Sequence, residues 1–254
     1  MRLILLSALF FSAVVGVYPQ QRIIGGSITT IQSYPYSAAA LITVDMVNFN
    51  HYCGGIILNS RSVLSIAACF YYSIPQTWKI RVGSSYSNSG GSVYAVSSLI
   101  SHPDFGYYFK ENDVGIYRIS STFVFGGNVQ PGSFAGPNYI VADNQTVTAI
   151  GWGVTAINGQ LSEQLRSVQI RTVNWNTCRS NYNIISMTVT ANMVCAGNLE
   201  QGGQAACRGD YGGPLLHNGN VIGIASWDAG CAYRGYPTVY TSVPKYITWI
   251  QTNA

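Results

Sequence analysis

Apolar and polar residues alternate along many short segments of the chain, and this period of two is typical of β-strands with one buried face. The segments are separated by clusters of Gly, Ser, Asn and Pro, as at residues 87–92 and 131–137. The pattern predicts an all-β protein, and a chain of 254 residues suits one β unit or two small barrels. The predicted strands lie at 55–58, 78–82, 114–119, 146–150, 165–170, 221–225 and 238–240.

The pattern changes near the C-terminus, where apolar residues fall on one helical face. Ser242 is a candidate N-cap, and Pro244 suits the first turn of a helix. The apolar face would consist of Tyr246, Ile247, Trp249 and Ile250. We therefore predict a short C-terminal helix that packs on the β-rich body.

The N-terminal end has the features of an export signal. Arg2 precedes an apolar run of about 13 residues, which is shorter than the roughly 20 that a bilayer-spanning helix needs. A basic start, a short apolar core and the small residue Gly16 are typical of a cleaved signal peptide. We predict a signal peptide at 1–16, a short propeptide at 17–22, and a secreted, extracellular protein without a membrane partner.

Composition narrows the class further. Only 9% of residues are charged, against roughly 25% in ordinary soluble domains, so a disordered chain or a coiled coil is not expected. The net charge of +4 is spread along the chain without a basic cluster. We therefore predict no nucleic-acid partner, because binding to phosphate backbones requires such a cluster.

The chain has six cysteines, which in an exported protein predict three disulfides and no free thiol. Fifteen pairings of six cysteines are possible, and the residues alone do not select one. No C-x-x-C pair is present, so we predict neither a metal site nor a cofactor. Export also makes the sequon Asn144-Gln145-Thr146 a predicted N-glycosylation site at Asn144. The six cysteines are Cys53, Cys69, Cys178, Cys195, Cys207 and Cys231.

Four motifs occur in a characteristic order: RIIGG at 22–26, SIAAC at 65–69, NDVGI at 112–116 and CRGDYGGP at 207–214. In this order and spacing the chain resembles the chymotrypsin-like serine proteases, particularly the trypsin-like digestive proteases of insects such as moths. The resemblance runs from Ile23 to Ala254. It implies two six-stranded antiparallel β-barrels with a cleft between them, the first at 23–131 and the second, with the C-terminal helix, at 132–254. It also implies the bridges Cys53–Cys69, Cys178–Cys195 and Cys207–Cys231.

The resemblance also shows which catalytic positions have changed. Proteases of this class use a Ser nucleophile, a His base and an Asp that orients the His. The His position holds Ala68 and the Ser position holds Tyr211, so Asp113 alone is retained and no catalytic set is intact. A methyl group cannot accept a proton, and a phenol with a pKa near 10 is a poor nucleophile without a base. The histidines of the chain match structural or surface positions of the family, at His51, His102 and His217.

The position of the substrate pocket is altered too. In trypsins an Asp at the base of the pocket pairs with Lys or Arg of the substrate, and Ala205 stands at that place. Two pocket glycines of the family are replaced by Asp228 and Thr238. Glycine permits close approach of a substrate backbone, so the side chains of Asp228 and Thr238 should narrow the substrate pocket.

Other elements of the family are present. Cleavage after Arg22 would free the amine of Ile23, which in the family pairs with the Asp found here as Asp210. That pair orders the loop whose backbone amides form the oxyanion hole, here Gly209 and Tyr211.

Two functional hypotheses follow. The first is a secreted, monomeric serine protease homologue that lacks peptidase activity and acts by binding a protein partner that the sequence does not identify. The alternative is a serine endopeptidase of the trypsin family that takes part in extracellular or digestive proteolysis. Ala68 and Tyr211 are the residues that distinguish the two hypotheses, because loss of the nucleophile lowers turnover about 10⁶-fold in subtilisin.

Overall fold

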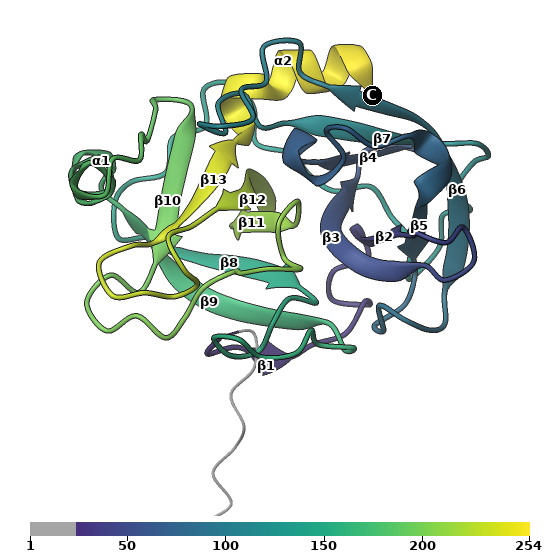
Figure 1. The fold of residues 1–254 in the computed structure, drawn as a ribbon, viewed down its shortest axis with the longest axis horizontal. Coiled ribbons are helices and arrows are strands. Elements are labelled where there is room, and N and C mark those ends of the chain that lie inside the picture. Colours follow the sequence, from purple (N-terminus) through teal and green to yellow (C-terminus); the bar gives the residue numbers. More distant parts are fainter. Residues whose placement is uncertain (1–23) are drawn as a thin grey trace, which may run out of the picture.

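The computed structural model describes residues 24–254, and these form two β-barrels that lie side by side (Figure 1). The predicted signal peptide, the propeptide and the Arg22–Ile23 bond lie outside the described residues. The first barrel is closed and antiparallel, with the strand order β2-β3-β4-β7-β6-β5. Its strands are β2 (Ser37–Ile42), β3 (Asn50–Ile57), β4 (Ser62–Ser65), β5 (Trp78–Val82), β6 (Ser92–Ser101) and β7 (Gly115–Ile119).

The second barrel has the order β9-β10-β13-β12-β11-β8 and closes through pairing of β8 with β9. A short strand, β1 (Ser27–Ile28), adds to the outer edge of β9. The prediction of two six-stranded antiparallel barrels is confirmed. Closure of each barrel pairs the backbone N–H and C=O groups of strands that would otherwise be exposed edges prone to aggregation. The strands of this barrel are β8 (Thr146–Gly151), β9 (Arg166–Val173), β10 (Met193–Gly197), β11 (Pro214–His217), β12 (Asn220–Trp227) and β13 (Thr238–Ser242).

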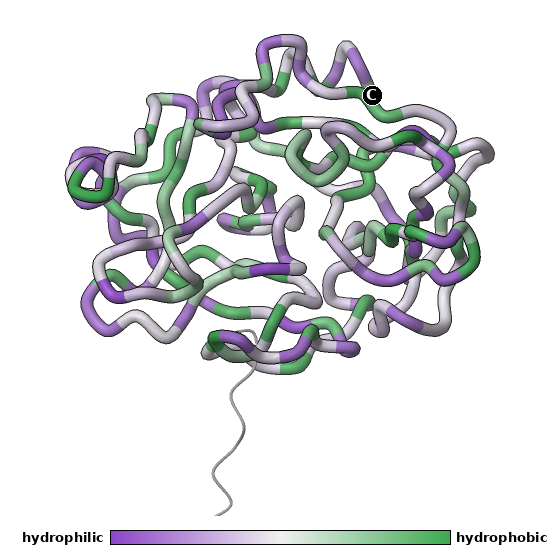
Figure 2. The backbone as a smooth tube through the Cα atoms, in the orientation of Figure 1, coloured by the Kyte–Doolittle hydropathy of each residue, from purple (hydrophilic) through white to green (hydrophobic). Residues whose placement is uncertain are grey.

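The barrel interiors are filled by alternate residues of each strand. In β5, Trp78, Ile80 and Val82 are buried, whereas Lys79 and Arg81 between them are partly exposed. Figure 2 shows the same alternation of hydrophobic and hydrophilic positions along strands of both barrels. Burial of the apolar face in this way is the main driving force for the fold.

The predicted C-terminal helix is confirmed as α2 (Val243–Asn253). Pro244 lies in its first turn, and Tyr246, Ile247 and Ile250 are buried. Ser242 occupies the N-cap position, but its side chain makes no capping hydrogen bond. The helix is therefore held by its apolar face rather than by its cap.

A second helix, α1 (Trp175–Ile184), was not predicted from the sequence. It begins after Asn174, whose side-chain oxygen accepts a hydrogen bond from the amide of Thr177 at 3.2 Å. Only Cys178 and Tyr182 of the helix are buried, and most of the other residues are polar. The described residues also contain two short 3₁₀ turns, Ala67–Cys69 and Pro75–Thr77.

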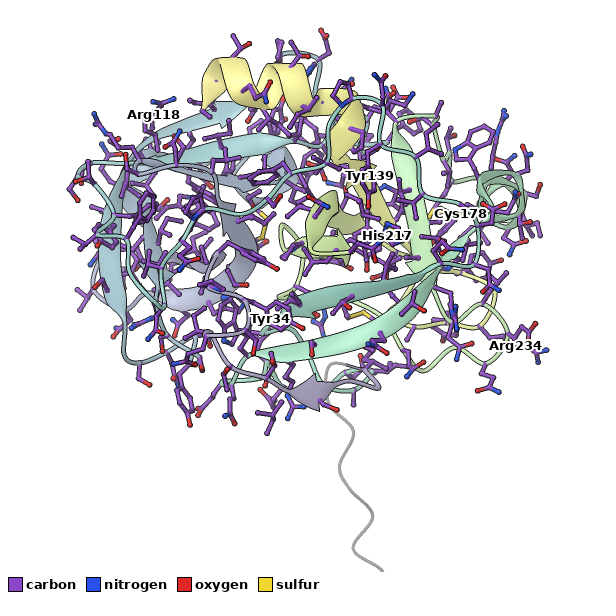
Figure 3. The ribbon with its side chains drawn as sticks, turned by 180° about the vertical axis from the view of Figure 1, so that it is seen from behind. Tyr34, Arg118, Tyr139, Cys178, His217 and Arg234 are labelled. Atoms are coloured by element: carbon purple, nitrogen blue, oxygen red, sulfur yellow. A yellow bond between two sulfur atoms is a disulfide. The ribbon has the colours of Figure 1, made fainter. Side chains whose placement is uncertain are left out.

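The two ends of the chain cross between the barrels. Strand β1 pairs with β9 of the second barrel, while α2 lies on the first barrel (Figure 1). The hydroxyl of Tyr246 donates to Asn112 Oδ1 at 2.8 Å, and Arg118 Nη2 donates to the carbonyl of Asn253 at 2.6 Å. Figure 3 shows Arg118 below the end of the helix. Each barrel therefore holds the chain end that belongs to the other half.

Three disulfides join the cysteines in the pairs that the family resemblance implied, Cys53–Cys69, Cys178–Cys195 and Cys207–Cys231, and no cysteine is free. Every bridge lies within one half of the chain. The first ties β3 to the turn that carries Ala68, and the second ties α1 to β10. Within residues 24–254, neither helix has the length and hydropathy that crossing a bilayer requires.

Candidate active-site cleft

A cleft of about 750 Å³ is lined by residues of both halves of the chain. The first half contributes Ala68 and Lys110, and the second contributes Tyr211, Trp227 and Asp228. Ala68 and Tyr211, the two positions at which the sequence predicts replaced catalytic residues, therefore face the same space. The cleft is open to solvent, and its size and mixed lining make it the candidate ligand-binding site of the described residues.

Asp113 lies behind the cleft wall, just before β7, and is fully buried. Its Oδ1 accepts a hydrogen bond from the Ala68 amide at 2.8 Å, and its Oδ2 accepts one from the Ser226 hydroxyl at 2.5 Å. Burial raises the pKa of Asp113 to about 6, and these hydrogen bonds limit the rise. The carboxylate is thus fixed beside residue 68, although no imidazole is there to be oriented.

Ala68 lies in the 3₁₀ turn and is partly exposed toward the cleft. Tyr211 is directed elsewhere, because its hydroxyl donates to Asp228 Oδ2 at 2.7 Å. Burial, followed by the charge of Asp228, raises the pKa of the Tyr211 phenol well above its ordinary value. The hydroxyl therefore stays protonated near neutral pH, and its proton is committed to a carboxylate.

His51 also lines the cleft, where its ring contacts Trp152 edge-on. Its Nε2 lies 2.8 Å from the carbonyl of Gly209, and a carbonyl can only accept, so Nε2 carries the proton. Nδ1 is buried without a partner among residues 24–254. Burial lowers the pKa of His51 to about 4, which makes it a neutral and weakly basic wall residue.

The other two histidines do not line the cleft. His102 packs against the Trp249 ring of α2 at 5.2 Å between centroids. His217 lies in the β11–β12 hairpin, and its Nδ1 is 2.9 Å from the hydroxyl of Tyr139. Figure 3 labels both side chains. Neither ring is placed to act on a ligand at Tyr211.

The loop 207–213 is shaped by Asp210, which is buried. Its Oδ1 accepts from the Gly153 amide at 2.6 Å and its Oδ2 accepts from the Cys207 amide at 3.1 Å. Burial raises the pKa of Asp210 to about 7. Gly209 has a φ of 89°, and a Cβ there would lie 2.9 Å from the Gly153 Cα, so glycine is required. Among the described residues, the amides of Gly209 and Tyr211 donate to no acceptor.

The predicted pocket residues separate into two groups. Ala205 and Thr238 are buried and do not line the cleft, and Thr238 Oγ1 donates to the carbonyl of Ala206 at 3.0 Å. Asp228 does line the cleft, and its Oδ1 accepts from two backbone amides of the following turn, each at 2.7 Å. The position that would carry a charge for substrate Lys or Arg is therefore both neutral and enclosed.

Two cleft residues were not singled out from the sequence. Lys110 stands three residues before Asp113, and its Nζ lies 3.9 Å from the centre of the Tyr107 ring. Arg208 directly follows Cys207 and is exposed. Lys110 is close in sequence to Asp113 and Arg208 lies within the CRGDYGGP motif, and these positions are the signal that would have identified them.

Two antiparallel barrels, with Asp113 held beside residue 68 in the wall between them, define a protein with the fold of the chymotrypsin-like serine proteases. The trypsin family model matches residues 23–250. Trypsin CFT-1 of Choristoneura fumiferana is 47% identical over 235 residues, which are 92% of each chain. Trypsin, alkaline A, of Manduca sexta is 47% identical over 257 residues and the full length of both chains. Achelase-1 of Lonomia achelous is 43% identical over 236 residues, which are 91% of this chain and 100% of that one. The chain belongs to the trypsin family.

Proposed function

We propose that this protein is a secreted trypsin-family homologue that does not hydrolyse peptides and acts by binding a protein ligand in its cleft. The observation that carries the proposal is the Tyr211 hydroxyl, bonded to Asp228 where the family has its nucleophile. Attack on a carbonyl requires an oxygen whose proton passes to a nearby base. Ala68 offers no base, and the Tyr211 hydroxyl keeps its proton in a hydrogen bond to Asp228.

The rest of the catalytic scaffold is incomplete without those two groups. Asp113 would orient an imidazole, and the amides of Gly209 and Tyr211 would stabilise an oxyanion. Both act only after a nucleophile has begun to attack. Their geometry is consistent with a fold that keeps its framework while its chemistry is lost.

Substrate selection is also changed in this proposal. Ala205 has no charge to pair with Lys or Arg, and it is buried and does not line the cleft. A trypsin substrate would therefore lose its main anchoring interaction as well as its nucleophile. Both losses favour a role in binding or regulation.

The alternative function, serine-type endopeptidase, is favoured by the comparisons, because relatives similar over 92% and 100% of the chain are named trypsins. An enzyme without its nucleophile can retain about 10³–10⁴-fold catalysis over water, from the oxyanion hole and binding. Under this alternative, Asp113 and the loop at Gly209 would remain parts of a working site.

Export and modification belong to the same proposal. Three disulfides are typical of proteins that fold in an oxidising compartment, which supports secretion. Asn144 is exposed, so the predicted sequon is accessible to glycosylation. We propose that the protein acts as a monomer and without a metal or cofactor.

The decisive experiment compares the protein, cleaved after Arg22, with the double variant Ala68→His/Tyr211→Ser on small ester and peptide substrates. We expect no turnover by the wild-type protein above a mock preparation, and weak ester hydrolysis by the double variant. Ala68→His/Tyr211→Ala is the matched control, since it has the base without the nucleophile, and should stay inert. Adding Ala205→Asp should introduce a preference for Lys or Arg esters.

Turnover by the wild-type protein that persists through purification would establish the endopeptidase instead. A folded double variant that remains inert on esters would show that the framework around Asp113 and Gly209 has also drifted. Activity in the Tyr211→Ala control would reveal a nucleophile elsewhere in the cleft.

A further inference from the structure

Two cationic side chains line the cleft from opposite halves of the molecule. Lys110 comes from the loop before Asp113, and Arg208 comes from the loop before Tyr211. Among residues 24–254, neither forms an ion pair or a side-chain hydrogen bond with the protein, and Arg208 is exposed. Lys110 is partly buried and lies in the electrostatic field of Asp113, so its ammonium and the exposed guanidinium of Arg208 keep their donors free for a ligand, with Arg208 the more accessible of the two.

Lys110 is held in place by aromatic rings. Its Nζ lies 3.9 Å from the centre of the Tyr107 ring. That ring stacks on Tyr71, with centroids 5.7 Å apart and planes 19° from parallel, and Tyr71 meets the edge of Phe105. A cation over an aromatic face is attracted by the ring and loses little freedom on binding an anion.

The carboxylates near the cleft are, in contrast, already satisfied. Asp228 accepts from the Tyr211 hydroxyl and from the amides of Gly230 and Cys231. Asp113 is fully buried and accepts from a backbone amide and a hydroxyl behind the wall. Asp228 keeps its negative charge, but its oxygens are directed to donors of the protein itself, whereas Lys110 and Arg208 are the charged cleft side chains whose donors the described residues leave free.

The cleft wall also offers apolar surface. Tyr52 is 52% exposed, Tyr107 is 43% exposed, and both rings line the same space as Trp227. A volume of about 750 Å³ accommodates several residues of an extended chain. Rings of this kind pack against peptide side chains and backbone, whereas a small inorganic anion would use only the charges.

We propose that the cleft binds an extended peptide segment that carries acidic side chains, with its carboxylates placed between Lys110 and Arg208. The inference rests on the proposed binding function and names the ligand class of that site. It reverses the charge preference of a trypsin, which accepts basic side chains. Charge complementarity of this type sets specificity and association rate more than total affinity, and salt weakens it.

The test uses a short fluorescent peptide with a central Glu-Glu pair flanked by Phe, together with its Gln-Gln and Lys-Lys versions. Binding is followed by fluorescence anisotropy with the full protein cleaved after Arg22. We expect the Glu-Glu peptide to bind roughly tenfold tighter than the Gln-Gln peptide, with the Lys-Lys peptide weakest. Raising the salt concentration should reduce the difference.

Variants identify the cations. Lys110→Met and Arg208→Gln should each weaken binding of the Glu-Glu peptide several-fold and leave binding of the Gln-Gln peptide nearly unchanged. Lys79→Met is the matched control, because Lys79 Nζ also lies 3.9 Å over an aromatic ring, that of Phe49, but does not line the cleft. The control should bind all three peptides like the wild-type protein.

Several outcomes would overturn the inference. These are equal affinity for the three peptides, an equal loss in Lys79→Met, or full displacement by inorganic phosphate at concentrations near that of the peptide, which would indicate a simple anion site. Mass spectrometry of the peptides after incubation separates the two proposals. Cleaved peptide would refute the proposed function, whereas intact peptide bound without charge preference would refute only the acidic-ligand inference.

Discussion

Asp113 shows how a single buried carboxylate is held in place by neutral donors. In the family, this carboxylate stabilises an imidazolium that forms during catalysis. Here its contacts are the Ala68 amide and the Ser226 hydroxyl, which are neutral, and the charge of Lys110 has only a secondary effect. Desolvation therefore dominates and raises the pKa of Asp113 to about 6.

This pKa has a consequence for stability. The folded-state pKa of about 6 exceeds the ordinary value of 3.8, so the folded protein binds this proton more tightly than the unfolded chain does. Asp113 should therefore reduce stability as the pH rises through the interval between these values. We expect the free energy of unfolding of Asp113→Asn, relative to wild type, to rise by on the order of 2 kcal/mol between pH of about 4 and about 7.

Urea denaturation at several pH values measures this difference, and Asp104→Asn, on an exposed loop, is the control. Asn can accept from the Ala68 amide through its oxygen and donate to the Ser226 hydroxyl, so the variant should fold. Curves for wild type and Asp113→Asn that run parallel with pH would contradict the prediction.

The positions of the site residues could be predicted, but their contacts could not. Motif order placed Ala68, Asp113 and Tyr211 together because the family fold fixes those positions. The hydrogen bond from Tyr211 to Asp228 joins side chains 17 residues apart, so it depends on the tertiary structure, which sets the rotamer of Tyr211. Lys110 faces the cleft because the aromatic rings of its own loop hold it there, which no local pattern reveals.

At the scale of elements, the two helices illustrate when a pattern is informative. Helix α2 was predicted because its buried residues are apolar and recur on one face. Helix α1 was not, because its sequence is rich in Asn, Ser and Thr, which favour caps and turns over helix interiors. Its position depends on the Cys178–Cys195 bridge and the burial of Tyr182, and these are tertiary interactions.

The start of α1 should depend on its cap. Asn174 accepts from the Thr177 amide and also donates to Asp143 Oδ2 at 2.7 Å. We expect Asn174→Ala to lower the free energy of unfolding by about 1 kcal/mol, since it removes both interactions. Asn183→Ala, an exposed change near the other end of α1, should be neutral or slightly stabilising. Equal losses in the two variants by urea denaturation would rule out a specific capping role.

At the scale of the whole molecule, we expect cleavage of the chain after Arg22 to affect the loop that Asp210 organises. Asp210 is buried with two amide donors and no cation among residues 24–254. Burial raises its pKa to about 7, so its ionised form is poorly compensated in the described part of the chain. The amine of Ile23, once free, would supply the missing positive charge.

We therefore expect cleavage after Arg22 to stabilise the protein at mildly alkaline pH by about 2 kcal/mol, the size of a hydrogen bond to a charged group. The gain should be absent in Asp210→Asn, and Arg22→Gln should resist the cut. Calorimetry before and after treatment with trypsin measures the effect. Cleaved protein with an unchanged melting temperature would show that the new amine does not reach Asp210.

The crossing of the chain ends has a consequence for how the protein survives proteolysis. No disulfide joins the two halves, and the connection between β7 and β8 carries exposed residues such as Val124 and Phe125. A nick there would sever the backbone, yet β1 would stay paired with the second barrel and α2 would stay packed on the first. The fragments should co-purify as one particle with an intact cleft, so damage would be visible on a denaturing gel long before it affected binding.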